Sequence, residues 1–125
     1  MNVPADLKYS EDHEWIKVEG ENAIIGITDY AQGELGDVVF VELPAVGDSF
    51  GKGDVAGTIE AVKTVADLFM PVGGTITEVN EKLEDGSELI NGDAYGEGWI
   101  LKISIDEPDE VETLLDAEAY TSIIS

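Results

Sequence analysis

A single lysine stands in a short apolar stretch near the middle of the chain, TIEAVKTVADLFM at residues 58–70. Lys63 has Glu60 three residues before it and Asp67 four residues after it, in a chain with only six basic residues, all lysines, and 28 acidic ones. A lysine amine on its long, flexible side chain is a common target of acylation. In a tight turn between two strands, it could be recognised by a ligase and carry a group on a swinging tether. From spacing alone, an ordinary solvated turn lysine is the simpler interpretation.

The side chains on which self-contained enzymes depend are scarce. The chain has one histidine, His13, and neither cysteine nor arginine. Histidine can act as an acid or base near neutral pH, although a structural or exposed histidine is the commoner case. No cluster with metal-ligand spacing occurs, and Gly51-Lys52-Gly53 does not match the dinucleotide fingerprint, so it predicts a turn rather than a phosphate site. We therefore do not expect an independent enzyme.

Size and composition predict one domain, residues 1–125. The chain of 125 residues is long enough for one core of its own, and its hydrophobic fraction of 43% is too high for a disordered protein. No apolar run reaches the length of a membrane span, and the first residues do not form a secretory signal. The absence of cysteine removes disulfides and thiolate chemistry. We therefore expect a monomeric protein of the cytoplasm.

The formal net charge of −22 limits the possible partners. A chain of this charge is repelled by nucleic acid and by anionic membranes, so neither is an expected partner. Positively charged protein surfaces are the natural counterpart. Solubility, or a saline habitat, explains the excess of acids equally well.

Glycine, proline and polar turns divide the chain into short segments of strand composition. These predict strands at residues 15–18, 23–27, 38–41, 55–60, 65–70, 75–79 and 101–105. The first two form a hairpin around residues 19–22, and Lys63 falls in the turn between the fourth and fifth. A helical turn follows residue 28, with Asp29 as its N-cap and Gly36 at its end.

The C-terminal part changes from strand to helix periodicity. Val111, Leu114 and Leu115 recur at helical spacing, and Pro108 suits a first turn. Residues 106–118 contain seven acids and no base, which is typical of a solvated helix face. We expect a C-terminal helical segment at about residues 107–124 that closes a mostly β domain.

Several segments together resemble one known family. They are HEW at 13–15, GITDYAQ at 26–32, LGDVVFVELP at 35–44, EAVKT at 60–64, Asn80 and YGEGW at 95–99. In order and spacing they resemble the H protein of the glycine cleavage system from about residue 7 to about residue 120. The resemblance implies a barrel-sandwich hybrid fold, like that of lipoyl and biotinyl carriers, with Lys63 at the tip of a β-hairpin.

The same resemblance implies a covalent cofactor and a carrier role. Lys63 would hold lipoic acid in amide linkage, and Glu60, Val62 and Thr64 would help a lipoate ligase or a lipoyl/octanoyl transferase to recognise it. Biotin carriers usually flank their lysine with methionines, so Val62 and Thr64 fit lipoylation better. A non-catalytic carrier in a bacterial cytoplasm would take the aminomethyl group of glycine from glycine decarboxylase (P protein) to aminomethyltransferase (T protein). Dihydrolipoamide dehydrogenase (L protein) would then reoxidise the dihydrolipoyl arm that remains on the carrier.

The resemblance also implies a place where the loaded arm docks. In the family this cleft lies beside the segment that matches His13 and Glu14, and Glu14 and Asp67 match acidic positions associated with the arm. Both could equally be surface acids among the 28. The sequence departs from the family at Asp12, where serine is common, and lacks the family's prolines in residues 86–91 and at Ala94.

Three other functions fit parts of this pattern. A lipoyl reservoir that donates lipoyl groups to other enzymes' lipoyl domains also needs Lys63. A small carboxylate enzyme that uses Glu60, Asp67 or His13 predicts turnover without a partner. An acidic binding module with an unmodified lysine predicts that Lys63→Arg is silent.

Overall fold

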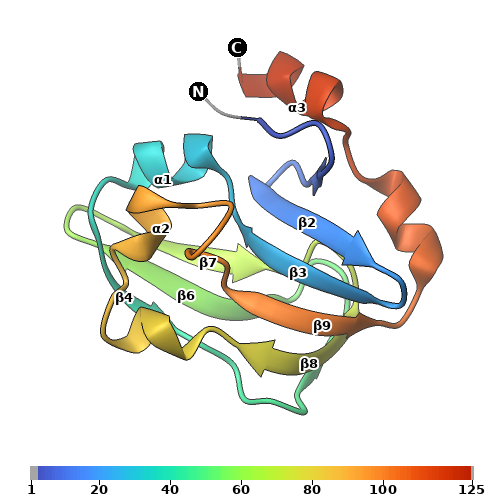
Figure 1. Cartoon of the computed structure of the whole chain (residues 1–125), viewed down its shortest axis with the longest axis horizontal. Helices are drawn as coiled ribbons and strands as arrows, with labels where there is room; N and C mark the ends of the chain where they lie inside the picture. The colour runs from blue at the N-terminus through green and yellow to red at the C-terminus, as the bar shows by residue number, and fades with distance from the viewer. Residues whose placement is uncertain (1–2, 125) are drawn as a thin grey trace.

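The computed structural model describes residues 3–124, which form two antiparallel sheets with short helices around them (Figure 1). One sheet has six strands in the order β1-β2-β3-β9-β8-β5, and the other has three in the order β4-β6-β7. The six-stranded sheet comprises β1 (Lys8–Tyr9), β2 (Glu14–Glu19), β3 (Asn22–Ile27), β9 (Leu101–Ile105), β8 (Gly74–Val79) and β5 (Ser49–Phe50). The three-stranded sheet comprises β4 (Val38–Glu42), β6 (Val55–Ala61) and β7 (Val65–Phe69).

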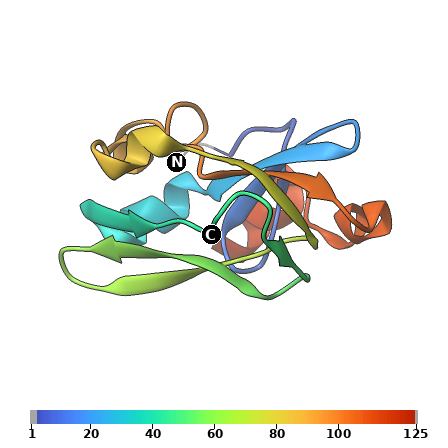
Figure 2. The ribbon, with the colours of Figure 1, turned by 90° about the horizontal axis from the view of Figure 1, so that it is seen from below.

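Five short helical segments connect or cover these strands. They are α1 (Asp29–Leu35), the 3₁₀ helix η1 (Glu81–Glu84), α2 (Leu89–Gly92), the 3₁₀ helix η2 (Pro108–Thr113) and α3 (Ala117–Ile124). Figure 2 shows the β6–β7 hairpin with β4 beside it on one side of the molecule, and η1 and α2 on the opposite side. No helix among residues 3–124 has the length and hydrophobicity that a membrane crossing requires.

The main core lies between the two sheets. In strands such as β9, alternate residues point inward, as the pleat of a half-buried strand requires. Ile25 and Ile103 from the six-stranded sheet and Ile59 and Leu68 from the three-stranded sheet are each at most 2% exposed. A mostly β fold with a short helix after residue 28 and a C-terminal helix is thus confirmed.

Seven of the strands were predicted from the sequence, and each begins and ends within one residue of its expected limits. The prediction missed β1 and β5, which have two residues each, and the short helices η1 and α2. Segments this short have too few residues to show a hydrophobic period.

The predicted N-cap of α1 was wrong by one residue. Thr28, with extended backbone, caps α1, because its Oγ1 accepts a hydrogen bond from the Ala31 amide at 3.1 Å. Asp29 instead lies in the first turn, where its carboxylate accepts from Gln32 Nε2 at 2.8 Å. Gly36 ends the helix as expected, with a φ of +79° that favours glycine.

The C-terminal helical segment consists of two separate helices. Between η2 and α3, Leu115 pairs with Tyr9 through two backbone hydrogen bonds of 2.8 Å. This pairing draws the chain back to β1, so helical geometry is interrupted there. A second apolar cluster then forms beneath α3, where the rings of Tyr9 and Tyr120 stack at 4.7 Å near Trp15.

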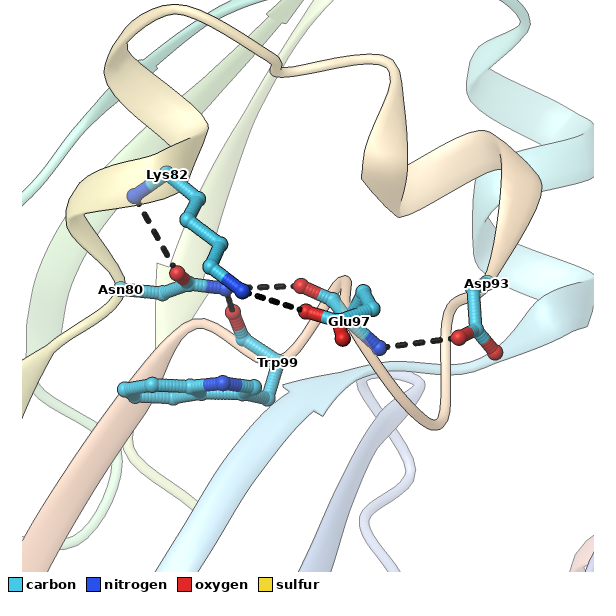
Figure 3. Close-up of polar contacts among 5 residues, drawn as sticks. All are labelled: Asn80, Lys82, Asp93, Glu97 and Trp99. Carbon is cyan, nitrogen blue, oxygen red and sulfur yellow. Dashed lines mark hydrogen bonds and ion pairs between the residues drawn. The ribbon is translucent and has the colours of Figure 1, made fainter.

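A buried asparagine joins η1 to the loop before β9 (Figure 3). Asn80 is 3% exposed, and its side-chain nitrogen donates to the carbonyl oxygens of Glu97 at 2.8 Å and Trp99 at 2.7 Å. Its oxygen accepts from the Lys82 amide, which caps η1. An exposed ion pair between Lys82 and Glu97 at 3.0 Å lies outside this contact.

Candidate functional site

The β6–β7 hairpin places Lys63 at its turn, as the sequence predicts. The Ala61 amide donates to the Thr64 carbonyl at 2.8 Å and closes the turn. The Val62 amide donates to the Asp37 carbonyl at 3.0 Å, which ties the tip to the loop after α1. Lys63 is exposed, and Figure 1 shows this hairpin at the left end of the molecule, below α1. The amine is therefore displayed from a turn held by backbone hydrogen bonds.

The Lys63 side chain lies against the end of α1. A methyl group added to Gly36 would lie 3.4 Å from Lys63 Cε and 3.9 Å from Nζ. Within residues 3–124, the ion pairs involve Lys17, Lys82 and Lys102 but not Lys63. An amine without a carboxylate partner is available for acylation.

A pocket of about 320 Å³ opens between α1, the turn before β2, and β6–β7. It brings together the three residues expected at an arm-docking cleft, His13, Glu14 and Asp67. The other residues that line it are Asp12, Ile27, Tyr30, Ala31, Glu34, Leu35, Ile59 and Ala66. Leu35 precedes Gly36 and Ala66 is three residues from Lys63, so the pocket lies next to the lysine hairpin. Glu60, Val62 and Thr64 do not line it and remain on the hairpin itself.

Glu14 is a buried carboxyl group in the wall of this pocket. It is 2% exposed, and this burial raises its pKa from 4.5 to about 8. Ser10 limits the shift, because its hydroxyl donates to the Glu14 carboxylate at 2.6 Å and accepts from the Glu14 amide at 3.1 Å. The neighbouring charge of Asp12 adds to the increase in pKa. At neutral pH, Glu14 is therefore mostly protonated and ready to ionise beside a cation.

His13 is held in an uncommon backbone conformation by contacts on two sides. Its φ is +69°, the one positive value at a non-glycine position in residues 3–124. Its Nδ1 lies 2.9 Å from the Tyr120 hydroxyl of α3, and its ring lies 4.9 Å from the ring of Tyr30. Such strain persists where surrounding contacts determine the conformation, and it is common at functional sites.

Helix α1 contributes residues to the pocket that the sequence did not indicate. Tyr30 and Glu34 lie one helical turn apart on its pocket face. The charge of Glu34 raises the pKa of the Tyr30 hydroxyl. The GITDYAQ segment contains Tyr30, but only the packing of α1 shows that it faces His13.

Within residues 3–124, no three His, Cys, Asp or Glu side chains are placed to hold one ion. The acids of the pocket are instead spread over its wall and rim, with Glu14 buried and Asp67 exposed.

Comparison with known proteins identifies the family. The family model for the glycine cleavage H-protein matches residues 7–125. The chain belongs to the glycine cleavage H-protein family. It has the lipoyl-carrier role of these proteins in the glycine cleavage system.

Individual H proteins from several bacteria are similar to this chain over nearly their whole length. The glycine cleavage system H protein of Bacteroides thetaiotaomicron is 54% identical over 125 residues, which cover 100% of this chain and 99% of that protein. The H protein of Symbiobacterium thermophilum is 60% identical over 119 residues, which cover 95% of this chain and 93% of that protein. The crystal structure of the H protein from Mycobacterium marinum matches with a TM-score of 0.87 at 37% identity and covers 98% of both chains. The predicted barrel-sandwich fold is thereby confirmed.

Proposed function

We propose that Lys63 carries lipoate in amide linkage, and that the chain presents this arm in turn to the P, T and L proteins of the glycine cleavage system. It takes the aminomethyl group of glycine from the decarboxylase to the aminomethyltransferase and then visits dihydrolipoamide dehydrogenase. The chain itself contributes no catalytic residue. It works as a monomer in a bacterial cytoplasm, and a lipoate ligase or a lipoyl/octanoyl transferase modifies it.

The position of Lys63 is the observation that carries this proposal. Its amine lies on a hydrogen-bonded hairpin turn, is exposed, and has no ion-pair partner among residues 3–124. Glu60, Val62 and Thr64 are exposed around it, so an acylating enzyme can read them together with the lysine. When bound, lipoate would supply a disulfide that is reduced as one sulfur accepts the aminomethyl group, and that is left as a dithiol once the one-carbon unit has been passed on.

The pocket beside the hairpin supports a docking role for His13, Glu14 and Asp67. The aminomethyl cargo is positively charged, and Glu14 can ionise beside it in a setting that excludes most water. Asp67 adds an exposed carboxylate at the rim, and His13 forms part of the wall with Tyr30. These residues hold and shield the cargo and do not react with it.

The net charge suits a carrier that visits several partners. Acylation removes the positive charge of Lys63, so the formal charge of −22 becomes more negative by one. Electrostatic attraction increases the rate of encounter with basic partner entrances. Weak contacts that dissociate quickly then allow the next visit.

The decisive experiment measures the intact mass of protein from a host supplied with lipoate. We expect a lipoyl increment on the parent protein and on Lys52→Arg, and none on Lys63→Arg. Lys52 is a matched control, because it is also an exposed lysine in a turn, but its Nζ donates to the Pro71 carbonyl and the Thr113 hydroxyl. An increment that persists on Lys63→Arg would refute the assignment of Lys63. Loading of the lipoylated protein by glycine decarboxylase then separates the carrier from a reservoir.

A further inference from the structure

Four exposed apolar side chains surround the lysine hairpin. Val62 and Val65 flank Lys63 in the chain and are 75% and 59% exposed. Val39 and Phe40 on the adjacent strand β4 are 53% and 52% exposed. We call Val39, Phe40, Val62 and Val65 the hairpin patch. Exposed apolar residues that cluster in this way mark interaction sites, whereas scattered ones need no explanation.

Strand pairing places Phe40 and Val65 of the hairpin patch in one row across the three-stranded sheet, with the exposed Glu60 between them. Phe40 pairs with Glu60 on β6, and Glu60 pairs with Val65 on β7, so the three side chains form one cross-strand row. The β4–β6 pairing shifts between Val38 and Phe40, which leaves Val39 without a partner in the register. Val39 and Phe40 are consecutive, yet both are exposed, as a bulge permits.

Acidic side chains border the hairpin patch. Asp37, Glu42 and Glu60 are exposed in or beside β4 and β6. The Val62 amide donates to the Asp37 carbonyl, so this border is joined to the hairpin tip. A complementary surface would be an apolar depression with basic side chains around it.

We propose that the hairpin patch is the docking surface for the enzyme that acylates Lys63. This inference rests on the proposed lipoylation of that lysine and extends it to β4. In the reaction, the neutral Lys63 amine attacks the carbonyl carbon of an activated lipoyl group. The activating group leaves, and the nitrogen loses a proton as the amide forms.

Geometry favours this partner over the three that act on the finished arm. An enzyme that forms a bond to Lys63 Nζ must bring its catalytic centre to within one side-chain length of the turn. Val62 and Val65 then fall inside its contact surface, and Phe40 lies in the same cross-strand row as Val65. Enzymes that act on the far end of the arm need to approach only that end.

The test compares lipoylation of apo variants by a purified lipoate ligase with ATP and lipoate, followed by intact mass. We expect Val39→Ser and Phe40→Ser each to lower kcat/KM about tenfold, as central interface residues do. Val46→Ser is the matched control, because Val46 is 61% exposed in the turn after β4 but outside the hairpin patch. Its rate should stay within about twofold of the parent. Far-ultraviolet circular dichroism and a urea transition check that each variant is folded.

The outcomes separate this inference from the assignment of Lys63. Lipoylation of Val39→Ser and Phe40→Ser at the parental rate would overturn the inference and leave Lys63 as the acceptor. The same rate with slower aminomethyl transfer would assign the hairpin patch to the aminomethyltransferase and would also overturn it. Parent protein that is never lipoylated would instead refute the proposed function.

Discussion

The hydroxyl of Tyr120 lies 2.9 Å from Nδ1 of His13, although 107 positions separate the two residues. The same hydroxyl lies 2.7 Å from Oγ1 of Thr28, the residue that caps α1. Helix α3 thereby joins the turn before β2 to the start of α1, which form two walls of the pocket. Burial raises the pKa of Tyr120 to about 12, so the hydroxyl keeps its proton and this link persists through neutral pH.

Removing this hydroxyl should loosen α1 as well as destabilise the fold. We expect Tyr120→Phe to lower the free energy of unfolding by about 1–3 kcal/mol, because the buried Thr28 hydroxyl and the half-buried His13 ring both lose a partner. Hydrogen exchange at the Ala31 amide, which donates to Thr28, should become faster. Urea denaturation and NMR-detected exchange measure the two effects.

Tyr9→Phe is the control for that variant. Its ring stacks on Tyr120 at 4.7 Å and is equally buried, but its hydroxyl donates to the Pro4 carbonyl, away from α1. It should cost about 0.5–1.5 kcal/mol without a change in Ala31 exchange. Equal exchange in both variants would show that the Tyr120 hydroxyl does not position α1.

Glu14 should make stability depend on pH. Its pKa rises from 4.5 in the unfolded chain to about 8 in the folded one, so the folded state binds more protons between these values. The contribution of protonated Glu14 to the stability of the fold is fully present below pH 4.5 and is lost as pH rises through 8. In the parent protein the free energy of unfolding should fall by up to about 1.4 kcal/mol per pH unit in this range, and Glu14→Gln should abolish this fall. Urea midpoints from pH 5 to pH 8 measure it.

Asp67→Asn is the comparison for Glu14→Gln, because Asp67 is an exposed carboxylate of the same pocket. Asp67→Asn retains Glu14, so its stability should still fall as pH rises from 5 to 8. A Glu14→Gln variant whose stability falls as steeply would show that Glu14 does not cause this loss.

Two glycines should respond in opposite ways to alanine. A Cβ at Gly26 would lie 2.7 Å from Trp15 Nε1, which donates to the Ala94 carbonyl at 3.0 Å. Gly26→Ala should therefore cost about 1–3 kcal/mol through overpacking and change the tryptophan fluorescence. Gly33→Ala in α1 meets nothing within 4 Å and should add about 0.5–1 kcal/mol of stability. Thermal unfolding distinguishes them, and a neutral Gly26→Ala would contradict the packing described.

The contact in Figure 3 predicts a large effect at Asn80 and a small one at Lys82. Asn80→Ala removes a buried side chain and leaves the carbonyls of Glu97 and Trp99 without their donor, so it should cost about 1–3 kcal/mol. Lys82→Gln removes only an ion pair whose side chains are 68% and 57% exposed, so it should cost about 0–1 kcal/mol. Urea denaturation of both variants tests the ranking, and equal costs would show that the ion pair holds this loop.

Local chemistry was enough to predict most of the strands and the lysine turn. Gly36 ends α1 because a positive φ suits glycine, and this preference can be read without any tertiary contact. The choice of Thr28 over Asp29 as N-cap could not be read in this way, since both residue types are good caps. It follows from β3, because the Thr28 amide donates to the His13 carbonyl at 3.0 Å and holds that residue extended.

Of the residues that line the pocket, the sequence indicated His13, Glu14 and Asp67, but it did not indicate their environment. Glu14 resembles any of the 28 acids, and the alternation of a half-buried strand does not predict three consecutive buried residues. In β2, Glu14, Trp15 and Ile16 are all buried, because the core covers one face and the cluster beneath α3 covers the other. Nothing in the sequence indicated that Tyr30 and Tyr120 contact His13, because neither is a near neighbour of His13 along the chain.

The sequence by itself determined the segments that form strands, the turn that displays Lys63, and, through its motifs, the family. These features depend on neighbouring residues, whose backbone preferences and order are written along the chain. Only the tertiary structure decided that Glu14 is buried, that Tyr120 bonds His13, and that Phe40 joins Val65 in one row. Burial and proximity arise from segments far apart in the sequence, and they set the pKa and the contacts on which the site depends.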